Sequence, residues 1–528
     1  ELLEYLATRP DDPARLREIS DALDMPRSSA HALLRTLVAQ GWVRSDPTGT
    51  YYGIGIRALL VGTSYLDSDP YLPLITPFLE ELRAIVEQRL STSEAVREQH
   101  GHGESYHPTC APDAVIFAKT TDEVSAVVKA CAARRVPIIP FGTGTSLEGH
   151  LAAVRGGVSI DLSQMDRIVA VNSDDMDATV EAGVTRKQLN EHLRDTGLFF
   201  PVDPGADASL GGMAATRASG TNAVRYGTMS ENVLSLTAVL ADGRIIRTSR
   251  RARKSAAGYD LTRLFVGSEG TLCVITEVTL RLYGIPEAIS AAVCSFSELE
   301  AAVNTVIATI QCGVPVARIE LLDDIQMDAV NKYSDFDYPV QPTLFFEFHG
   351  STAGVAEQAE MVGDIAGDFG GSGFQWATRP EDRTRLWQAR HDAYYAALAL
   401  KPEARGMATD VCVPISRLAE CITETKKDID DSGLLAPIVG HVGDGNFHLV
   451  LLIDPDDEEE MARCTALNER MVMRALAMDG TCTGEHGVGY GKIDFLTAEH
   501  GEGVSVMRAV KTALDPSDIM NPGKIVRV

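Results

Sequence analysis

Residues 137–150 read PIIPFGTGTSLEGH, and this stretch decides the fold of the larger part of the 528-residue chain. Its apolar beginning predicts a short strand. The Gly, Thr and Ser residues that come next expose consecutive backbone N–H groups, which form a concavity suited to a pyrophosphate. Because the stretch lacks the third glycine of a Rossmann fingerprint and lies too far along its unit, nicotinamide binding is disfavoured. Such a pattern also builds ordinary turns, so it needs support from elsewhere in the chain.

Two later stretches supply that support. Residues 204–215 read PGADASLGGMAA and continue into ASG at 218–220, and residues 264–276 read LFVGSEGTLCVIT. Such a density of small residues lets the backbone lie flat against a large planar ligand. Around these stretches the chain alternates short strands and helices, among them a helix predicted at 121–133 with Thr121 as its N-cap. The three stretches together predict one cofactor site.

A histidine-rich stretch lies further along the chain, where residues 440–448 read GHVGDGNFH between two apolar, β-branched runs. Asp444-Gly445 predicts a two-residue hairpin loop, because both loop positions need positive φ and these residues tolerate it. Counting outward from this loop pairs His441 with His448. Directly paired residues on one face have Cβ atoms about 5 Å apart, so the two imidazoles would meet on the hairpin.

A carboxylate and a third imidazole lie later in the chain, in a glycine-rich turn that holds Glu485 and His486. Two imidazoles and one carboxylate can hold a divalent metal and still leave positions open for a substrate. We therefore predict that His441, His448 and Glu485 bind a metal and that His486 is left for proton transfer. The alternative is a pair of histidines that hydrogen-bond across a hairpin beside an ordinary loop.

The composition is ordinary for a globular protein, with 45% apolar and 23% charged residues. The length suggests about three domains. A net charge of −26 argues against a nucleic-acid coat and mildly favours a basic protein partner. The nine cysteines contain no C-x-x-C pair and no apolar run is long enough to cross a bilayer, so we expect a cytoplasmic protein with reduced thiols and no transmembrane segment. A homodimer is an allowed oligomeric state.

The first residues of the chain have a different character. Helical spacing at 15–23, a break at 24–26, a second helix at 27–40 and two strands within 42–52 give the layout of a winged helix-turn-helix. A stripe without acidic residues runs from residue 26 to residue 45 and contains Arg27, His31, Arg35 and Arg44. Such a stripe could meet phosphates, although a solvated face of a helical interaction module is the alternative.

Residues 16–23 (LREISDAL) and 27–37 (RSSAHALLRTL) resemble the DNA-binding domain of IclR-type transcription regulators. The resemblance implies a DNA-binding module at 1–56 and a linker helix at 57–88. The chain beyond residue 88 does not resemble the effector domain of that family. This departure leaves two hypotheses open: a DNA-binding regulator that uses a borrowed flavoprotein domain as its sensor, and a chance fusion in which the module has no role.

The chain from residue 89 to 528 resembles the vanillyl-alcohol oxidase type flavoproteins, and within them the D-lactate dehydrogenase (cytochrome) and glycolate oxidase D-subunit family. The three glycine-rich stretches and the histidine cluster carry the resemblance, together with RKSAAGYDL at 253–261. It implies an α+β fold with a two-subdomain FAD-binding domain of the PCMH type at 89–284. An α+β cap domain with the metal site would come next at 285–510, and a return to the FAD-binding domain at 511–528.

The resemblance also implies FAD, held without a covalent bond because Phe141 and Thr143 stand in the loop where some relatives carry a histidine. We expect contacts to FAD from all three glycine-rich stretches and from Asn521, with the role of His150 left open. The expected cofactor-binding residues are Pro140, Gly142, Thr143, Gly144, Thr145, Ser146, Gly149, His150, Pro204, Gly205, Ala206, Asp207, Gly211, Gly212, Ala215, Ser219, Gly220, Glu269, Gly270, Ile275 and Asn521.

The reaction implied by the resemblance is the oxidation of a D-2-hydroxy acid, with D-lactate to pyruvate as the first choice. A divalent metal, Zn or Mn, would bind the substrate hydroxyl and carboxylate, and His486 would take the hydroxyl proton while hydride passes to flavin N5. Arg390 is expected to pair with the substrate carboxylate, a salt bridge being its alternative fate. Asn446 and Asp444 are candidates for orienting the imidazoles. The electron acceptor would be a cytochrome c, a quinone or an electron-transfer flavoprotein.

Overall fold

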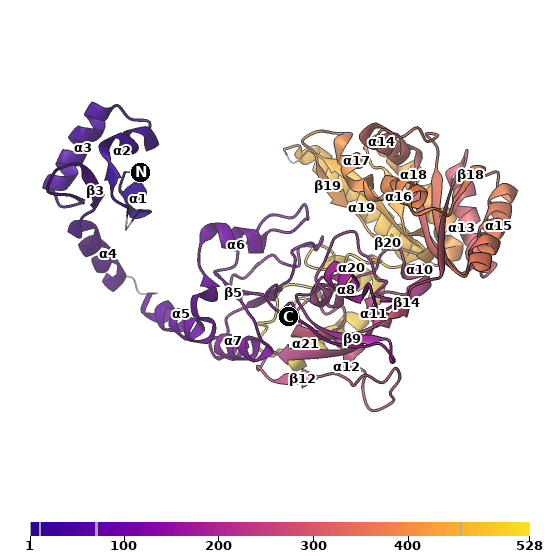
Figure 1. Cartoon of the computed structure of the whole chain (residues 1–528), viewed down its shortest axis with the longest axis horizontal. Helices are drawn as coiled ribbons and strands as arrows, with labels where there is room; N and C mark the ends of the chain where they lie inside the picture. Colours follow the sequence, from indigo (N-terminus) through magenta and orange to yellow (C-terminus); the bar gives the residue numbers. More distant parts are fainter. Residues whose placement is uncertain (1, 10–11, 69–71, 455) are drawn as a thin grey trace. The chain divides into compact units, whose positions relative to one another are not determined.

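A computed structural model describes residues 2–9, 12–68, 72–454 and 456–528 of the chain. The chain forms two compact units, Glu1–Glu81 and Leu82–Val528, which we call unit 1 and unit 2 and describe separately (Figure 1).

Unit 1 contains the predicted winged helix-turn-helix. Helices α2 (Leu16–Ala22) and α3 (Arg27–Ala39) pack on a small core in which Ile19 and Leu34 are fully buried. Gly41 follows α3 with a φ of +76°, as expected of a glycine that ends a helix. The other elements before the linker are α1 (Leu2–Ala7), β1 (Ala14–Arg15), β2 (Val43–Ser45) and β3 (Tyr51–Ile54).

The wing has one strand more than the sequence predicted. β2 and β3 form the expected antiparallel pair, and β1 adds a third strand through the pairing of Ala14 with Tyr52. The linker predicted as one helix at 57–88 comprises α4 (Ile56–Ser68), α5 (Leu72–Val86) and a short 3-10 turn, η1 (Glu87–Arg89), while residues 69–71 lie outside the described residues.

The first sheet of unit 2 carries the glycine-rich stretch at 137–150. Its order is β4-β5-β7-β6, and β5 and β6 both run parallel to β7. The helix α7 (Thr121–Arg134) is the crossover that connects β5 to β6 and lets these two strands run in the same direction. The glycine-rich loop therefore begins directly where β6 ends. The four strands are β4 (Leu90–Ser91), β5 (Ala114–Phe117), β6 (Ile138–Phe141) and β7 (Val158–Asp161).

The predicted N-cap of α7 was wrong by one residue. The cap is Thr120, whose extended backbone lets its hydroxyl oxygen accept a hydrogen bond from the N–H of Glu123 at 3.1 Å. Thr121 already lies within the helix. The two adjacent threonines are chemically equivalent caps, and only the backbone conformation distinguishes them.

A second sheet of five antiparallel strands, in the order β12-β11-β13-β9-β8, stands beside the first. The short helix α9 (Leu210–Thr216) carries the second glycine-rich stretch and packs on β13. The strands are β8 (Ile168–Asn172), β9 (Asp177–Glu181), β11 (Val233–Leu240), β12 (Ile245–Arg247) and β13 (Cys273–Arg281), with a separate ribbon of β10 (Leu198–Phe199) and β14 (Tyr283–Gly284). The helices of this half are α6 (Glu94–Gly101), α8 (Arg186–Leu193), α10 (Ala223–Tyr226), α11 (Met229–Asn232) and α12 (Leu261–Phe265).

The cap is built on an eight-stranded sheet in the order β18-β15-β17-β16-β21-β22-β19, with β20 paired to β22. All eight residues of β22 are buried, because helices cover both faces of the sheet. The strands are β15 (Ala288–Ser295), β16 (Val316–Leu322), β17 (Thr343–Gly350), β18 (Ser372–Ala377), β19 (Arg405–Ala408), β20 (Val411–Cys412), β21 (Ile438–Gly440) and β22 (Asn446–Ile453).

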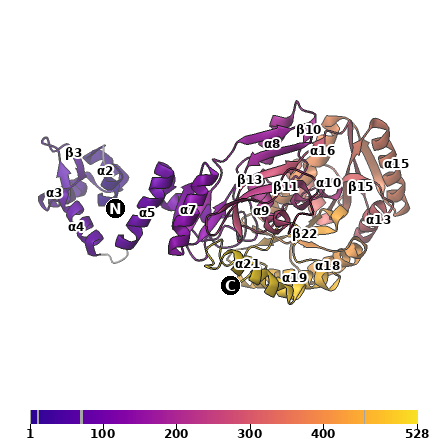
Figure 2. The same ribbon diagram turned by 90° about the horizontal axis from the view of Figure 1, so that it is seen from below.

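The helices of the cap divide between the two faces of this sheet. One group shares a large apolar core: α15 packs on β15 and β17, and α13 packs on α15. Figure 2 shows α13 and α15 near β15. This group is α13 (Leu299–Gln311), α15 (Thr352–Asp368), α18 (Leu418–Ser432) and α19 (Glu458–Ala477). The other group is α14 (Asp324–Ser334), α16 (Pro380–His391) and α17 (Ala393–Ala399). Within the described ranges, no helix is both long and apolar enough to span a bilayer.

The predicted register of the histidine hairpin was wrong. β21 and β22 pair Val439 with His448, so His441 lies beyond the end of β21 and is not opposite His448. The connection contains a 3-10 turn, η3 (Val442–Asp444), and only Gly445 has a positive φ, at +82°. A two-residue loop of the predicted type needs positive φ at both positions, and Asp444 does not supply it.

The chain returns to the first sheet after α20 (Ile493–His500) and α21 (Gly503–Leu514). Ile138 donates its N–H to the carbonyl of Ile519 at 2.7 Å, and its own carbonyl accepts the N–H of Asn521 at 2.8 Å. Behind this contact the buried ammonium of Lys511 donates to the carbonyls of Thr271 and Met520 and pairs with the buried carboxylate of Asp515. Residues 519–521 thus pair with the beginning of the strand that leads into the glycine-rich loop.

We expect Lys511→Met to lower the free energy of unfolding by about 3–5 kcal/mol, because the carboxylate of Asp515 is left buried without its cation. The comparison is Arg527→Met, which breaks an exposed ion pair with Asp494 and should cost at most about 1 kcal/mol. Denaturant unfolding followed by circular dichroism measures both. Equal losses for the two variants would contradict the role of Lys511.

Candidate active site

A cavity of about 760 Å³ lies within unit 2, between the two sheets that carry the glycine-rich stretches and the sheet of the cap. Its walls include Pro140 and residues 142–147 and 203–208 from the first half of the unit. The cap contributes Arg390, Tyr394 and the predicted metal ligands. One cavity therefore receives the glycine-rich stretches and the histidine cluster together.

The glycine-rich wall has the properties of a cradle for a phosphate-bearing cofactor. A Cβ on Gly142 would collide with the hydroxyl of Ser209, and a Cβ on Gly144, whose φ is +78°, would press on the ring of Phe141 at 3.1 Å. The buried hydroxyls of Ser146 and Ser209 have no hydrogen-bond partner among the described residues. Glycines that leave no room for a Cβ, and the unpaired hydroxyl of Ser146, meet at the cavity wall, and such a wall fits the pyrophosphate of FAD.

The structure separates the predicted cofactor residues into two groups. Five of them do not line the cavity. Gly211 lies against Ala182, where a Cβ would not fit, and Ile275 belongs to the apolar core of its own sheet. These five are Gly149, Gly211, Ala215, Gly220 and Ile275. The residues that line the cavity are Pro140, Gly142, Thr143, Gly144, Thr145, Ser146, His150, Pro204, Gly205, Ala206, Asp207, Gly212, Ser219, Glu269, Gly270 and Asn521.

The predicted metal ligands converge despite the altered register. The Nε2 atoms of His441 and His448 lie 3.1 Å and 3.3 Å from the same oxygen, Oε1 of Glu485. Their ring centroids are 5.5 Å apart and their planes are nearly perpendicular. His448 Nε2 is buried and has no hydrogen-bond partner among the described residues. Two imidazole nitrogens and a carboxylate oxygen directed at one point form a donor set suited to a divalent cation.

The other nitrogen of each imidazole is already engaged. His441 Nδ1 lies 2.7 Å from Oε1 of Glu320, and His448 Nδ1 lies 2.9 Å from the carbonyl oxygen of Thr409. A carboxylate or carbonyl behind a histidine is the usual arrangement at metal sites, because it fixes the ring and leaves the opposite nitrogen as a lone-pair donor. The predicted alternative, two histidines hydrogen-bonded to each other, does not describe this geometry.

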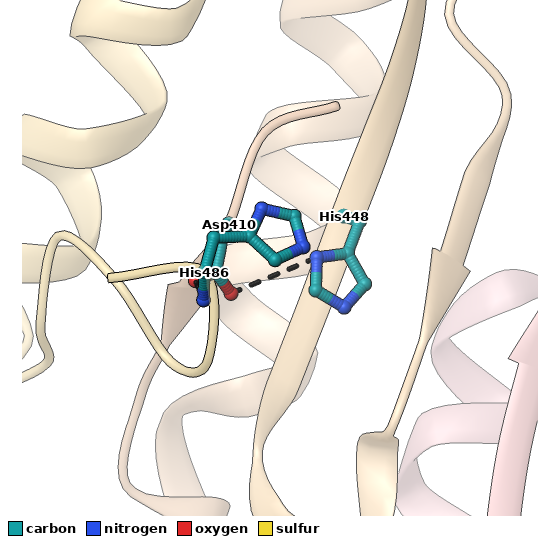
Figure 3. Close-up of side chains that lie close together, drawn as sticks. All are labelled: Asp410, His448 and His486. Carbon is teal, nitrogen blue, oxygen red and sulfur yellow. Dashed lines mark hydrogen bonds and ion pairs between the residues drawn. The ribbon is translucent and has the colours of Figure 1, made fainter. Parts of the chain in front are cut away.

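A second possible ligand set overlaps the first and consists of Asp410, His448 and His486 (Figure 3). Asp410 is fully buried, and its Oδ2 already accepts hydrogen bonds from the backbone N–H groups of Glu485 and His486. Its Oδ1 accepts one from Nδ2 of Asn446 at 2.7 Å. Because both carboxylate oxygens are occupied by donors, we assign Asp410 to orienting this turn and not to binding a metal.

The charges around His441 favour a positive charge at this point. Burial lowers the pKa of His441, but the carboxylates of Glu320 and Glu485 outweigh burial and raise that pKa well above its ordinary value. Burial raises the pKa of Glu485, and the two imidazoles outweigh it and hold the pKa well below the usual range. The same field that favours a proton on His441 would favour a divalent cation in its place, so binding of a cation here would release a proton.

His486 is placed differently from the other two histidines. Its ring stacks on that of His448, with centroids 4.9 Å apart, and its buried Nδ1 has no hydrogen-bond partner among the described residues. Burial lowers the pKa of His486 below its ordinary value, which leaves the imidazole neutral at neutral pH. Nδ1 lies 3.8 Å from Oε1 of the buried Glu148. Because His486 also lines the cavity, its neutral imidazole can accept a proton there.

Arg390 lies at the cavity wall, and its Nε donates to Oε2 of Glu320 at 2.7 Å. Glu320 is fully buried, and its other oxygen, Oε1, lies beside Nδ1 of His441. The two oxygens of this carboxylate thus join Arg390 to His441. The salt bridge foreseen as the alternative fate of Arg390 is present, but it is buried at the cavity and not exposed. The pairing of Arg390 with a substrate carboxylate stays a prediction.

Two acidic residues at the site, Glu320 and Asp410, received no role from the sequence. Glu320 interrupts the apolar run of β16, where a charge facing the core needs a partner. Asp410 stands directly before β20 and is likewise fully buried. For Glu320, an acidic residue within an otherwise apolar strand segment was a signal in the sequence that could have pointed to a buried, paired carboxylate. Two groups were expected to orient the imidazoles. Asn446 donates a hydrogen bond to Asp410 and not to an imidazole. For Asp444, burial raises the pKa to about 7.

We expect Glu320→Gln to weaken divalent-metal binding by about 10- to 100-fold, because the ring of His441 loses the carboxylate that orients it. Titration of the metal-stripped protein with Mn or Zn measures the change. The matched control is Glu347→Gln, which alters a buried acid on the neighbouring strand that pairs with His349 and should leave metal affinity unchanged. Equal affinity for wild type and Glu320→Gln would contradict this role.

Comparison with known families agrees with the two halves of unit 2. Residues 112–249 match the FAD binding domain model, and residues 285–525 match the model for the C-terminal domain of FAD linked oxidases. Residues 1–47 match the IclR helix-turn-helix domain. The fold and the site thus define an FAD-linked oxidase preceded by a helix-turn-helix module.

Curated relatives narrow this class. A probable mitochondrial D-lactate dehydrogenase of Danio rerio is 56% identical over 84% of this chain and 90% of its own length. The mitochondrial D-lactate dehydrogenase [cytochrome] of Arabidopsis thaliana is 49% identical over 85% and 80%. Glycolate oxidase subunit GlcD of Bacillus subtilis is 34% identical over 78% and 89%. The chain belongs to the family of FAD-dependent D-lactate dehydrogenases (cytochrome), and it is an oxidoreductase.

Solved structures of more distant sequence share the fold. A substrate-bound p-cresol methylhydroxylase superposes with a TM-score of 0.69 at 17% identity, covering 86% of this chain and 97% of the other. An alkyldihydroxyacetonephosphate synthase superposes with a TM-score of 0.66 at 21% identity, covering 85% and 84%. The predicted α+β fold, with its two-subdomain FAD-binding domain and cap, is confirmed.

Proposed function

We propose that this protein oxidises a D-2-hydroxy acid, with D-lactate as the first substrate, in a reaction that depends on FAD and on a divalent metal, Zn or Mn. The observation that carries the proposal is the single cavity in which a fitting FAD cradle faces His441, His448 and Glu485, with the neutral His486 beside them. Relatives named D-lactate dehydrogenase support the choice of substrate.

The roles of the residues follow from their placement. A cation held by His441, His448 and Glu485 would lower the pKa of an alcohol bound to it. FAD, when bound, supplies the acceptor for the hydride. The imidazole of His486, which lines the cavity, takes the hydroxyl proton of the substrate. Arg390 lines the same cavity and would pair with the substrate carboxylate while its Nε remains hydrogen-bonded to Glu320.

The test is anaerobic addition of D-lactate to the purified holoenzyme, followed by flavin absorbance. We expect bleaching with D-lactate and much less with L-lactate. Absence of bleaching with D-lactate and with any other D-2-hydroxy acid would overturn the proposal. A series of D-2-hydroxy acids with longer side chains then defines the size of the substrate.

The electron acceptor belongs to the same proposal. A net charge of −26 favours a basic carrier such as a cytochrome c, as the names of two relatives suggest for those proteins. Quinones and electron-transfer flavoprotein are the competing acceptors. Comparison of their reduction rates decides among them, and a rate that falls steeply with added salt indicates the basic protein. A cytoplasmic location and a homodimer stay predictions, which cell fractionation and light scattering test.

A second function, DNA binding by unit 1, has its own observation in its favour. Helix α3 exposes Arg27, His31 and Arg35, and the IclR helix-turn-helix model matches residues 1–47. We propose that this helix contacts DNA. Binding to duplex DNA that weakens with rising salt concentration supports it, and no binding at low salt rejects both DNA recognition and the role of the protein as a regulator.

A further inference from the structure

The segment Thr483–Gly489, which we call the catalytic turn, carries both Glu485 and His486 yet belongs to no helix or strand. A segment without a backbone ladder is normally mobile. Precise placement of two reacting side chains therefore needs another restraint. The restraint is provided by two buried carboxylates that accept hydrogen bonds from the backbone of the turn.

The first carboxylate holds the turn from the cap. Oδ2 of Asp410 accepts the N–H of Glu485 at 2.8 Å and the N–H of His486 at 2.9 Å. The hydroxyl of Thr483 donates to the same oxygen at 2.7 Å. Asp410 lies between β19 and β20, so this contact fixes the beginning of the turn to the sheet that also carries His448.

The second carboxylate holds the turn from the FAD-binding half. Oε1 of Glu269 accepts the N–H of Val488 at 2.7 Å, and Oε2 accepts the N–H of Gly489 at 2.8 Å. Glu269 itself is tied down: its N–H donates to the carbonyl of Ala215, and its carbonyl accepts a hydrogen bond from Nδ2 of Asn521. Its Oε2 also lies 3.2 Å from Nε2 of His150. Because Glu269 lines the cavity, its contact to FAD stays a prediction beside this role in the turn.

Gly487 stands between the two carboxylates and shows how closely the parts are packed. Its φ is +81°, and a Cβ added there would lie 2.6 Å from Oε1 of Glu269 and 2.8 Å from Nε2 of His150. No side chain other than hydrogen fits at this position. The turn thus lies directly against the Glu269 carboxylate.

We propose that Glu269 is a positioning residue that, with Asp410, clasps the catalytic turn and sets the distance between His486 and the FAD cradle. The two carboxylates come from the two halves of unit 2, so the turn is held to the cap at one end and to the FAD-binding half at the other. Hydrogen bonds to a buried charged acceptor are about twice as strong as neutral ones. This inference rests on the proposed function, because it assigns a task to His486 in that reaction.

The first test measures how firmly the catalytic turn is held and does not depend on enzyme activity. In Glu269→Gln the side-chain amide presents an N–H donor to one of the two backbone donors, so one hydrogen bond is lost. We expect amide hydrogen exchange in a peptide that covers 484–490 to accelerate by about 10- to 100-fold, measured by mass spectrometry on the FAD-loaded protein without substrate. Exchange in α21 should stay unchanged.

The second test measures the kinetics of D-lactate oxidation by the same variant. Glu269→Gln should lower kcat for D-lactate by about 10- to 100-fold with a smaller change in KM, because the proton acceptor is displaced and the substrate is not. The isotope effect with D-lactate deuterated at C2 should rise as the chemical step becomes limiting. A variant that was merely unstable would lose active protein without a change in the isotope effect.

The matched control is Glu277→Gln, on β13 of the same half, where the carboxylate accepts a hydrogen bond from the hydroxyl of Thr237 and does not line the cavity. It should leave both exchange and kcat as in wild type. Unchanged exchange in Glu269→Gln, or faster exchange with unchanged kcat and isotope effect, overturns the proposal. If wild type fails to oxidise any D-2-hydroxy acid, the proposed function fails instead, and exchange alone decides whether the clasp exists.

Discussion

Replacement of His486 by asparagine is expected to lower kcat for D-lactate by about 10²- to 10⁴-fold, the usual contribution of a positioned general base. The imidazole of His486 lines the cavity, and burial lowers its pKa, which favours the neutral form that accepts the hydroxyl proton. Asparagine fills a similar volume beside His448 but cannot accept the proton. Rapid-mixing measurement of flavin reduction under anaerobic conditions gives the rate of this step directly.

The interpretation of that result requires intact cofactors. The bound FAD and metal of His486→Asn should match those of wild type, because neither the cradle nor the donor set has changed. His500→Asn, an exposed histidine at the end of α20, is the control and should reduce flavin at the wild-type rate. A rate within about threefold of wild type for His486→Asn would assign the proton to another group.

The second large effect concerns the metal. His441→Ala should lose both the bound metal and turnover, with kcat/KM reduced by about a thousandfold or more, because a Lewis acid contributes several kcal/mol to such a step. The loss of this ring also leaves Glu320 and Glu485 as two buried carboxylates without the cation between them. Metal analysis of the purified variant, beside steady-state kinetics, measures both outcomes.

Two comparisons separate a metal requirement from a folding defect. Wild type dialysed against a chelator should show the same kinetic loss and should recover when Mn or Zn is returned. His192→Ala removes an exposed imidazole from α8 and should change neither metal content nor rate. Full activity of His441→Ala without metal would remove the metal from the mechanism.

The sequence brought the glycine-rich stretches forward as one cofactor wall, but it could not distinguish the two kinds of glycine within them. Gly142 and Gly212 line the cavity, whereas Gly211 and Gly220 do not line it and lie against Ala182 and Asp203. Both kinds lack a Cβ for the same steric reason, so composition alone does not tell a ligand contact from a close packing contact. Only the path of the backbone separates them.

The histidine cluster was predicted correctly in composition and wrongly in register. The sequence placed His441 opposite His448, but Val439 occupies that position. The turn that displaces His441 brings it to Glu320, which lies 121 positions earlier in the chain. A rule for local turns contains no information about such a distant partner, and the contact with it outweighs the preference of Asp-Gly for a tight loop.

The buried acids illustrate the same limit in another form. Glu320 and Asp410 each hold groups from several segments, and their importance follows from contacts that exist only after the sheets have formed. Before folding, each is one of 74 acidic residues in a strongly acidic chain. Burial is what marks them, because a charge taken out of water must be paired.

The strand contact between Ile138 and residues 519–521 has a consequence for biosynthesis. Asn521 donates to the carbonyl of His150, 371 positions earlier, and both residues line the cofactor cavity. When the ribosome has synthesised the FAD-binding half, the cofactor cavity still lacks Asn521, because the whole cap is translated before that residue. We therefore expect the flavin to bind late in synthesis. Nascent chains stalled within the cap should be partly folded but should carry no bound flavin, as measured by flavin absorbance.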